Sequence, residues 1–464
     1  MNELVEDPAF ASWVGRQRWY SGAGSSPRLT LTASYPLDLG DSAARGVVAI
    51  VADADGAHYQ VPLAFGSAGE ARPETITTLD GVPVSDGTRD QAVAAALLTL
   101  AMSVGVRSGD GITVSGQPFG HAPVSIARSR VLSGEQSNTS IIFDLTDPSG
   151  TPTTSAILKV FRVVHHGDNP DVVLQSAIAA AGSTRVPRSL GAVVGEWGEG
   201  RGHLAFAQEF LPDTRDAWRV ALDAATAGED FTERARALGA ATAEVHGVLA
   251  ATMPTEPPSA DRVESIGRSF RERMFAAFVA VPALERFLGA IETIYDQAAD
   301  EPWPAFQRVH GDYHLGQVLE VPGRGWVLLD FEGEPLRPMT ERNAADLALR
   351  DVAGMLRSFD YAAGSVTLAD PSRAAAATEW AAAARAAFLD GYEHGGGDPI
   401  DAHPALLTAL ELDKALYEAL YEARNRPDWL PIPTLAIARL VLAGEPLDEQ
   451  TPSGSDSEST GVSE

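Results

Sequence analysis

A short run in the second half of the chain limits the folds that this sequence can adopt. Residues 310–312 read His-Gly-Asp, which is typical of a turn because glycine permits a strained backbone. Apolar residues on either side of the Pro-Gly-Arg-Gly turn at 322–325 predict two short buried strands. A hairpin of that length returns Asp330 to the neighbourhood of Gln317, a few residues after Asp312.

These three side chains are of the types that phosphoryl transfer requires. One carboxylate accepts the proton of the attacking hydroxyl, and a second carboxylate with a neutral oxygen ligand holds the metal that spans the nucleotide phosphates. Asp312 suits the first role, and Gln317 with Asp330 suits the second. Each residue alone would be typical of an ordinary acidic turn, but the whole set favours a catalytic site.

A lysine upstream of this run is the second feature that indicates phosphate chemistry. Lys159 is one of only two lysines in a chain that otherwise uses arginine. It lies in the apolar segment 156–161, which predicts a strand. A lysine on such a strand reaches the α- and β-phosphates of the nucleotide in kinase-like proteins. A solvent-facing lysine at a strand edge is the alternative, and the acidic run downstream favours the phosphate role.

Two further segments predict nucleotide contacts. The linker 133–139 joins two expected strands and ends in small polar residues whose backbone N–H groups could face phosphate oxygens, although it lacks the ending of a Walker A loop. The strand 204–212 runs into a proline where a two-lobed kinase would cross between lobes, and its backbone could pair with adenine. The expected nucleotide-binding residues here are Ser137, Asn138, Thr139, Gln208 and Phe210.

Composition narrows the class of protein. A hydrophobic share of 45% and a charged share of 21% are those of a soluble globular protein. The net charge of −28 argues against non-specific binding to nucleic acid or anionic membranes. The absence of cysteine excludes disulfides and thiol catalysis. The acidic start lacks a signal peptide, and no apolar run is long enough for a bilayer, so we expect a cytoplasmic protein.

The pattern along the chain predicts an α+β protein in several parts. Residues 1–115 mix strands and a helix without obvious catalytic groups, and 116–213 read as the strands of a nucleotide-binding lobe. Residues 214–447 are mainly helical, with apolar residues at helical spacing. The Ser-, Gly- and acid-rich end, 448–464, is expected to be disordered.

Several motifs together resemble the maltokinases, within the aminoglycoside-phosphotransferase-like small-molecule kinases. The general group is indicated by the His-Gly-Asp turn with Asp330. The narrower likeness rests on the segments 314–317, 330–335, 350–361 and 421–429, with weaker support from 134–140 and 17–20. The resemblance implies a two-lobed protein-kinase-like (aminoglycoside phosphotransferase) fold with an N-terminal α+β cap and a mainly helical C-terminal lobe.

The same resemblance implies an activity. A maltokinase phosphorylates the anomeric hydroxyl of maltose with ATP and Mg²⁺, giving maltose 1-phosphate and ADP for bacterial glycogen and α-glucan synthesis. By matching positions, Asp312 would be the catalytic base, and Gln317 with Asp330 the Mg²⁺ ligands. The resemblance also implies an association with trehalose synthase.

The chain departs from the family pattern next to the lysine. The family usually has a Glu in the helix after the lysine strand, and here Val173 occupies that position. Asp171 or Asp168 could pair with Lys159 instead, or the ion pair could be absent.

The acceptor is the least constrained part of the prediction. Hydrogen-bonding and flat apolar groups suited to a sugar are expected from His314, Arg357, Tyr421, Glu422, Arg426 and Trp429. Core packing is an equal explanation for the two aromatic residues of this set. The alternatives are a kinase for another sugar or an amino sugar such as glucosamine, whose amine would suit nearby acids, or a catalytically impaired kinase-like binding partner.

Overall fold

The computed structural model describes residues 1–22, 24, 26–40, 42, 44–67, 74–120, 124–132, 137–334 and 337–444. The expected disordered end, 448–464, and the linker residues 133–136 lie outside this set. Two compact units divide the chain: Met1–Pro258 with Pro304–Ile400, and Ser259–Trp303 with Asp401–Glu464. No described helix has the length and apolar character needed to cross a membrane.

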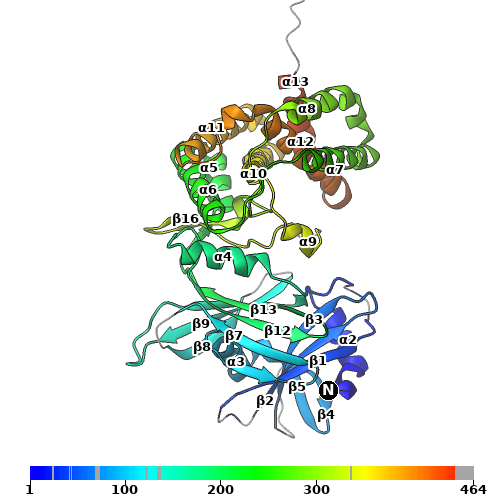
Figure 1. Ribbon diagram of the computed structural model, residues 1–464, viewed down its shortest axis with the longest axis vertical. Coiled ribbons are helices and arrows are strands. Elements are labelled where there is room, and N and C mark those ends of the chain that lie inside the picture. Colours follow the sequence, from blue (N-terminus) through cyan, green and yellow to red (C-terminus); the bar gives the residue numbers. More distant parts are fainter. Residues whose placement is uncertain are drawn as a thin grey trace, which may run out of the picture. The chain divides into compact units, whose positions relative to one another are not determined.

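The first unit begins with a sheet that is covered on both faces (Figure 1). Its strands run in the order β1 (Thr30–Leu37), β2 (Arg45–Ala52), β3 (His58–Phe65), β5 (Val82–Asp86) and β4 (Thr75–Leu79). Because side chains alternate along a strand, Val47 and Val51 of β2 pack with Phe10, whereas Val48 and Ile50 join a different core. Phe10 lies on α2 (Pro8–Gly15), which follows the short helix α1 (Asn2–Val5).

The second sheet carries the lysine strand. Its seven antiparallel strands run in the order β6 (Val106–Ser108), β7 (Ile112–Pro118), β12 (Ser189–Trp197), β13 (Gly200–Glu209), β10 (Ala156–Phe161), β9 (Asn138–Thr146) and β8 (Ser125–Val131). Helix α3 (Gln91–Ala101) contributes apolar side chains to the core of this sheet. Helix α4 (Pro170–Ala180) follows the lysine strand in the chain.

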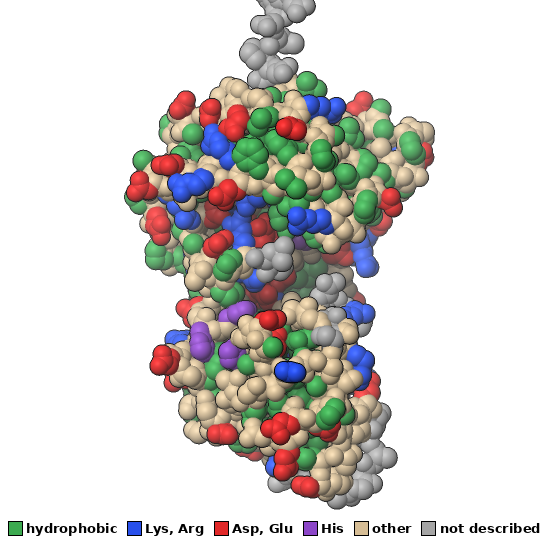
Figure 2. All heavy atoms as spheres, turned by 90° about the vertical axis from the view of Figure 1, so that its right-hand side faces the viewer, with side chains coloured by type: hydrophobic (Ala, Val, Ile, Leu, Met, Phe, Trp, Pro, Cys, Tyr) green, Lys and Arg blue, Asp and Glu red, His purple; other side chains and the backbone are tan. Residues whose placement is uncertain are grey.

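A short strand joins the two sheets. β11 (Val163–Val164) comes directly after the lysine strand and pairs with β3 of the first sheet. Next to it the ring centroids of His58 and His166 lie 6.5 Å apart, and those of His166 and Trp197 lie 4.5 Å apart. Histidine side chains are seen to gather on this part of the surface in Figure 2. The chain segment that follows Lys159 is therefore anchored to the first sheet.

The rest of the first unit is mainly helical. It contains α5 (Ala217–Ala227), α6 (Thr232–Thr252), α9 (Met339–Arg342), α10 (Ala348–Ala369) and α11 (Ala374–His394). Helices α6 and α11 approach closely at two glycines: a Cβ on Gly239 would lie 2.0 Å from the carbonyl oxygen of Phe388, and one on Gly391 would lie 2.0 Å from that of Arg236. A three-stranded sheet of β14 (Arg215–Asp216), β15 (Val318–Val321) and β16 (Gly325–Leu328) contains the hairpin expected before Asp330.

The second unit is helical in its described residues. It consists of α7 (Ala260–Ala280), α8 (Leu288–Asp300), α12 (Pro404–Asn425) and α13 (Pro431–Gly444). Glu301 caps the start of α12, since its carboxylate accepts the backbone N–H groups of Ala405 and Leu406 at 2.9 Å each. The boundaries predicted at 115 and 213 stay a prediction.

Candidate active site

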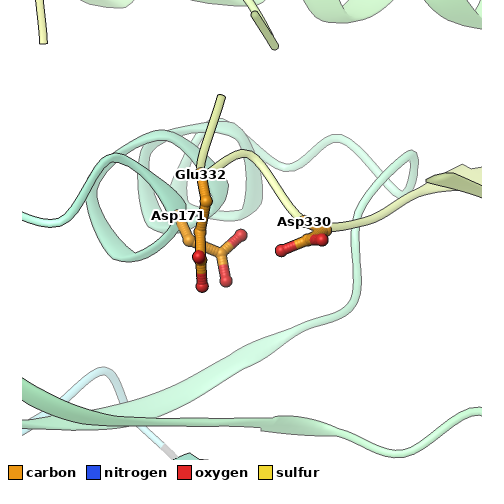
Figure 3. A group of neighbouring side chains, drawn as sticks. All are labelled: Asp171, Asp330 and Glu332. Atoms are coloured by element: carbon orange, nitrogen blue, oxygen red, sulfur yellow. The ribbon is translucent and has the colours of Figure 1, made fainter. Parts of the chain in front are cut away.

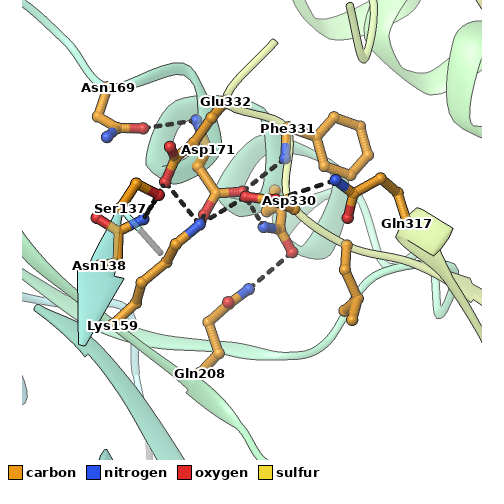
Figure 4. A network of polar contacts seen from close by, with 12 residues as sticks. Ser137, Asn138, Lys159, Asn169, Asp171, Gln208, Gln317, Asp330, Phe331 and Glu332 are labelled. Atoms are coloured by element: carbon orange, nitrogen blue, oxygen red, sulfur yellow. Dashed lines mark hydrogen bonds and ion pairs between the residues drawn. The ribbon is translucent and has the colours of Figure 1, made fainter. Parts of the chain in front are cut away.

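The centre of the site is Lys159, which lies on β10 between its two neighbouring strands. Leu158 and Val160 are buried in the core, and alternation therefore turns Lys159 to the opposite face of the sheet. Its Nζ lies 2.6 Å from Asp330 Oδ1, 2.6 Å from Glu332 Oε1 and 3.1 Å from Asp171 Oδ2 (Figure 4). Burial alone would lower the pKa of Lys159, but the three carboxylates raise it well above its usual value. The lysine therefore stays charged.

Asp171 takes the place that the expected glutamate would occupy beside Lys159. Asn169 caps α4 by accepting the N–H of Asp171 at 2.8 Å, which puts this carboxylate in the first turn of the helix. Its Oδ1 accepts the backbone N–H of Phe331 at 2.7 Å and a hydrogen bond from Gln175. Asp168, the other candidate partner, lies instead 3.9 Å from Arg201. Asp171 is thus the residue that pairs with the lysine.

Asp330 sits in a backbone conformation that few residues other than glycine adopt. Its φ is 62°, in the left-handed region that Asp tolerates better than most side chains. The hairpin continues into this residue through Leu329, whose N–H donates to the carbonyl oxygen of Gln317 at 2.9 Å. Gln317 Nε2 also donates to Asp330 Oδ2 at 3.1 Å. Burial opposes ionisation of Asp330, but the Lys159 ammonium outweighs it and lowers the pKa of the carboxyl.

Glu332 is a residue of the site that the sequence reasoning missed. Its Oε1 accepts from Asn138 Nδ2 at 2.9 Å as well as from Lys159. Burial, with the neighbouring charges of Asp330 and Asp171, raises its pKa despite the lysine. The available signal was the second acid of the Asp-Phe-Glu segment, two residues after Asp330.

A cluster of carboxylates here has the chemistry of a cation site. Oxygens of Asp171, Asp330 and Glu332 lie within 4.8 Å of one another (Figure 3). Hard divalent cations such as Mg²⁺ prefer oxygen ligands of this kind. Gln317 donates its amide Nε2 to Asp330 here, and the oxygen of the same amide is a neutral ligand of the type that Mg²⁺ accepts. The donor set therefore fits Mg²⁺.

A buried aspartate accepts hydrogen bonds from the backbone of the turn that carries Asp312. Asp351 of α10 accepts the backbone N–H groups of His310 and Gly311 at 2.8 and 3.0 Å. Its Oδ2 also lies 3.1 Å from Nε2 of His246, whose Nδ1 lies 3.0 Å from the hydroxyl of Tyr392. Burial opposes ionisation of Asp351, but the hydrogen bonds from His246 and from the backbone outweigh it and lower the pKa of this carboxyl. The sequence motif 350–361 contained Asp351, but its residues did not indicate this role.

His310 connects the same turn to the strand that precedes Asp330. Its Nε2 lies 2.8 Å from the carbonyl oxygen of Leu329, so this nitrogen must carry the proton and donate. The N–H of Asp312 donates to Nδ1 at 3.4 Å, which is consistent with the neutral ring. Gly311 has a φ of 84°, and a Cβ there would lie 3.3 Å from the Cα of Gly333. Asp312 and Asp330 are therefore held on one rigid frame.

A cavity of about 590 Å³ opens beside Lys159. Apolar walls come from Ile157, Leu319 and Leu329. The lining includes these expected site residues: Ser137, Asn138, Lys159, Gln208, Phe210, Gln317 and Asp330. Thr139 is not among the lining residues; its hydroxyl accepts from Arg162 Nε at 2.8 Å. The size of the cavity suits a small-molecule cofactor.

The expected sugar-binding residues fall into two groups. Two of them lie in the first unit. His314 caps a single helical turn, since its Nδ1 accepts the N–H of Gly316. Arg357 is 1% exposed and pairs with Asp360. The others lie together in the second unit, where the guanidinium of Arg426 pairs with Glu422 at 2.6 Å and lies 5.6 and 4.9 Å from the ring centroids of Tyr421 and Trp429. Their role toward a sugar stays a prediction.

Comparison with known proteins gives three findings. A family model described as the maltokinase N-terminal cap domain matches residues 13–90. A glucosamine kinase of Streptacidiphilus jiangxiensis is 31% identical over 95% of this chain and 98% of its own length. A second glucosamine kinase, from Mycolicibacterium smegmatis, is 28% identical over 66% of this chain and 79% of its own.

A solved structure agrees with these relatives. A glucosamine kinase in complex with glucosamine, ADP and inorganic phosphate superposes with a TM-score of 0.69 at 26% identity, covering 95% of this chain and 98% of that one. The fold thus defines a kinase with the two-lobed architecture of the aminoglycoside phosphotransferases, an N-terminal cap and a mainly helical C-terminal lobe, which confirms the predicted fold class. Within this class the chain belongs to the glucosamine kinase family.

The maltokinase resemblance was therefore wrong as to the family and the acceptor. The relatives that match along the whole chain are glucosamine kinases, and the maltokinase name attaches only to the cap model at 13–90. Two of the four segments behind the narrower likeness, 314–317 and 330–335, contain or adjoin the expected base and metal ligands, which serve the phosphoryl group and do not determine which sugar accepts it. The sugar-binding role expected for residues of the other two, 350–361 and 421–429, stays a prediction.

Proposed function

We propose that this kinase transfers the γ-phosphoryl group of ATP to a hydroxyl of glucosamine. The observation that supports the acceptor most strongly is the likeness to a glucosamine kinase over 95% of the chain. A related structure holds glucosamine with ADP and phosphate. The net charge of −28 also favours a cationic amino sugar over a neutral disaccharide, because a negative surface attracts the ammonium group.

ATP would bind in the cavity beside Lys159. The charged Nζ is the group that can bind the α- and β-phosphates, and Ser137 and Asn138 line the cavity at the start of the neighbouring strand β9. Ile157, Phe210 and Leu319 supply apolar surface for the adenine. Nζ of Lys159 contacts the carboxylates of Asp171, Asp330 and Glu332, and a phosphate would replace some of these contacts.

The metal proposed here is Mg²⁺. Asp330 and Gln317 would hold it, with Asp171 and Glu332 close by, because all four offer hard oxygen donors. When bound, the ion supplies positive charge that offsets the charge of the phosphates. The protein's own contribution is to keep Asp330 ionised, which Lys159 does by lowering the pKa of its carboxyl.

Asp312 would orient the acceptor hydroxyl and take its proton. The hydroxyl oxygen attacks the γ-phosphorus in line, the bond from that phosphorus to the bridging oxygen breaks, and ADP leaves with the electron pair. The backbone of the Asp312 turn is fixed by Asp351 and by His310. This rigidity holds the base at one distance from the metal site.

A panel of acceptors tests the proposal. We expect kcat/KM, measured as ADP release, to be about 100-fold or more higher for glucosamine than for glucose, N-acetylglucosamine or maltose. Protein groups that bind the amine would be left without a partner when the sugar is neutral. Comparable rates with a neutral sugar would overturn glucosamine as the acceptor.

A catalytically impaired binding partner remains the other class of function to test. The geometry favours the enzyme, since Lys159, Asp171 and Asp330 form a complete set of ion pairs. The association with trehalose synthase rested on the maltokinase resemblance and has no other support. Stabilisation of the chain against thermal unfolding by ATP with Mg²⁺, and turnover of that ATP, would exclude the impaired partner.

A further inference from the structure

An arginine outside the predicted site lies against the catalytic turn. Arg342 ends α9, and its side-chain stem covers Gly333: a Cβ on this glycine would lie 3.5 Å from Cγ of Arg342. Gly333 in turn lies against Gly311, the residue before Asp312. Both glycines have left-handed φ angles, of 72° and 84°. The positive φ angles favour glycine at both positions, and the arginine stem and the Asp312 turn both lie against Gly333.

The segment that carries Arg342 is fixed at several points. Its Nε donates to the carbonyl oxygen of Arg337 at 2.8 Å. The following residue, Asn343, accepts from Arg308 at 3.2 Å and donates to the carbonyl oxygen of Asp168 at 2.8 Å. The Nε of Arg342 is thus held by a backbone carbonyl and the next residue by two further hydrogen bonds, which limits the entropy that the side chain loses on binding a ligand.

The charges around Arg342 are those of the reaction centre. Burial lowers the pKa of Arg342, and the carboxylates that oppose this effect are Glu332, Asp312 and Asp330. Because the stem of Arg342 lies against Gly333, the residue after Glu332, the charges of the expected base and the expected metal ligand act on its guanidinium. Lys159, by contrast, forms ion pairs with Asp171, Asp330 and Glu332. A phosphoryl group that passes from the metal site to an acceptor hydroxyl bound by Asp312 would therefore be attracted by the positive charge of Arg342.

We propose that Arg342 is a catalytic residue whose guanidinium binds the γ-phosphoryl group during its transfer. This inference rests on the proposed phosphoryl transfer. The moving group carries its negative charge on three equatorial oxygens, and a guanidinium matches such oxygens with two parallel N–H donors. Arg342 exchanges no proton: the hydroxyl proton goes to Asp312, and the electron pair of the broken bond leaves with ADP. Lys159 would then bind the α- and β-phosphates, which remain in ADP, and Arg342 would bind the γ-phosphoryl group that is transferred.

The test compares binding of ADP with binding of ADP plus aluminium fluoride, which mimics the group in transfer, in the full chain with Mg²⁺ and no sugar. Wild type should bind ADP with aluminium fluoride at least about 100-fold more tightly than ADP alone. In Arg342→Ala we expect this gain to fall by about 100-fold or more, with the Kd for ADP changed less than about threefold. Steady-state kinetics should show the same loss in kcat, with little change in the KM for ATP.

Arg236→Ala is the matched control. Arg236 lies on α6 and pairs with Glu233 and Asp390, so this variant should behave as wild type in both measurements. The proposal is overturned if Arg342→Ala keeps the full gain from aluminium fluoride, or if its affinity for ADP alone falls by the same factor. Should Arg342→Ala not fold, Arg342→Gln keeps a donor for the Arg337 carbonyl and is judged by the same two outcomes. Failure of glucosamine as acceptor leaves the fluoride result unchanged, so the two proposals fail separately.

Discussion

Asp171 joins the lysine strand to the loop that carries the metal-binding aspartate. One oxygen of Asp171 lies 3.1 Å from Nζ of Lys159, and the other accepts the N–H of Phe331, the residue after Asp330, at 2.7 Å. A single buried carboxylate thus fixes the lysine and Asp330 relative to each other. Val173, where the family pattern has a glutamate, is compensated by an acid one half-turn earlier in the same helix.

Removing the charge of Asp171 should therefore weaken nucleotide use. We expect Asp171→Asn to raise the KM for ATP and to lower kcat/KM by about 10- to 100-fold, because the variant keeps an acceptor for Phe331 but loses its ion pair with Lys159. Steady-state kinetics over a range of ATP concentrations measure this. Asp168→Asn is the control, since Asp168 is largely exposed and lies apart from Lys159. Equal effects of the two substitutions would contradict the assignment of Asp171.

Glu332 should affect the requirement for metal. Its carboxylate belongs to the cluster with Asp171 and Asp330, so we expect Glu332→Gln to raise the Mg²⁺ concentration for half-maximal activity by about tenfold. A Mg²⁺ titration at saturating ATP measures the change. Glu320→Gln, a substitution of a partly exposed acid paired with Arg234, should leave the titration unaltered. An unchanged Mg²⁺ requirement in Glu332→Gln would exclude Glu332 from the cation site.

Asp351 should contribute to stability in a pH-dependent way. Hydrogen bonds lower its pKa in the folded chain, so its contribution is full above its unfolded value of about 3.9 and is lost as the pH falls through the lower folded value. Asp351→Asn would turn amide hydrogens toward the N–H donors of His310 and Gly311, and we expect it to lower the free energy of unfolding at pH 7 by about 2–4 kcal/mol.

Denaturant unfolding at several pH values measures this effect. The difference between wild type and Asp351→Asn should shrink as the pH falls below about 4. Asp370→Asn is the control, because Asp370 is exposed and asparagine also caps a helix well. A difference that stays constant down to low pH would show that the Asp351 charge is not what stabilises the turn.

One buried arginine connects the N-terminal cap to Thr139, one of the expected nucleotide-binding residues. Arg162 is 1% exposed; its Nη2 lies 3.2 and 3.1 Å from the two oxygens of Asp86, and its Nε donates to Thr139 at 2.8 Å. Arg162→Lys cannot make the paired contacts, so we expect a loss of about 3 kcal/mol in the free energy of unfolding and a higher KM for ATP. A variant that is destabilised but has an unaltered KM for ATP would show that this contact of the cap does not affect nucleotide binding.

The local elements were largely predictable from the sequence. Apolar β-branched residues around Lys159 indicated the strand 156–161, and the turn at 322–325 indicated the hairpin, because both depend on neighbours in the chain. Within the part predicted to be helical, Val352, Met355, Leu356 and Phe359 recur at helical spacing on α10, and all four side chains are buried. The prediction that three site residues converge was also local in part, because the hairpin connects Gln317 to Asp330. Lys159 lies against the same aspartate.

The rest depended on packing between distant segments. Whether Asp171 or Asp168 pairs with Lys159 is decided by where Asn169 caps α4, and the support that Asp351 gives to the Asp312 turn comes from a helix some forty residues away. The stem of Arg342 lies against Gly333, a contact that neighbours in the chain do not indicate. The acceptor could not be found from the phosphate-binding motifs, because they contact the part of the reaction that all such kinases share.

Replacing Asp312 tests whether it is the base of a phosphoryl transfer to glucosamine. Turnover of Asp312→Asn is to be measured at saturating ATP, Mg²⁺ and glucosamine, with ATP affinity measured on the same preparation. We expect kcat to fall by about 10²- to 10⁴-fold while ATP still binds, because the asparagine can orient the hydroxyl but cannot accept its proton. Near-normal turnover in Asp312→Asn would contradict the account.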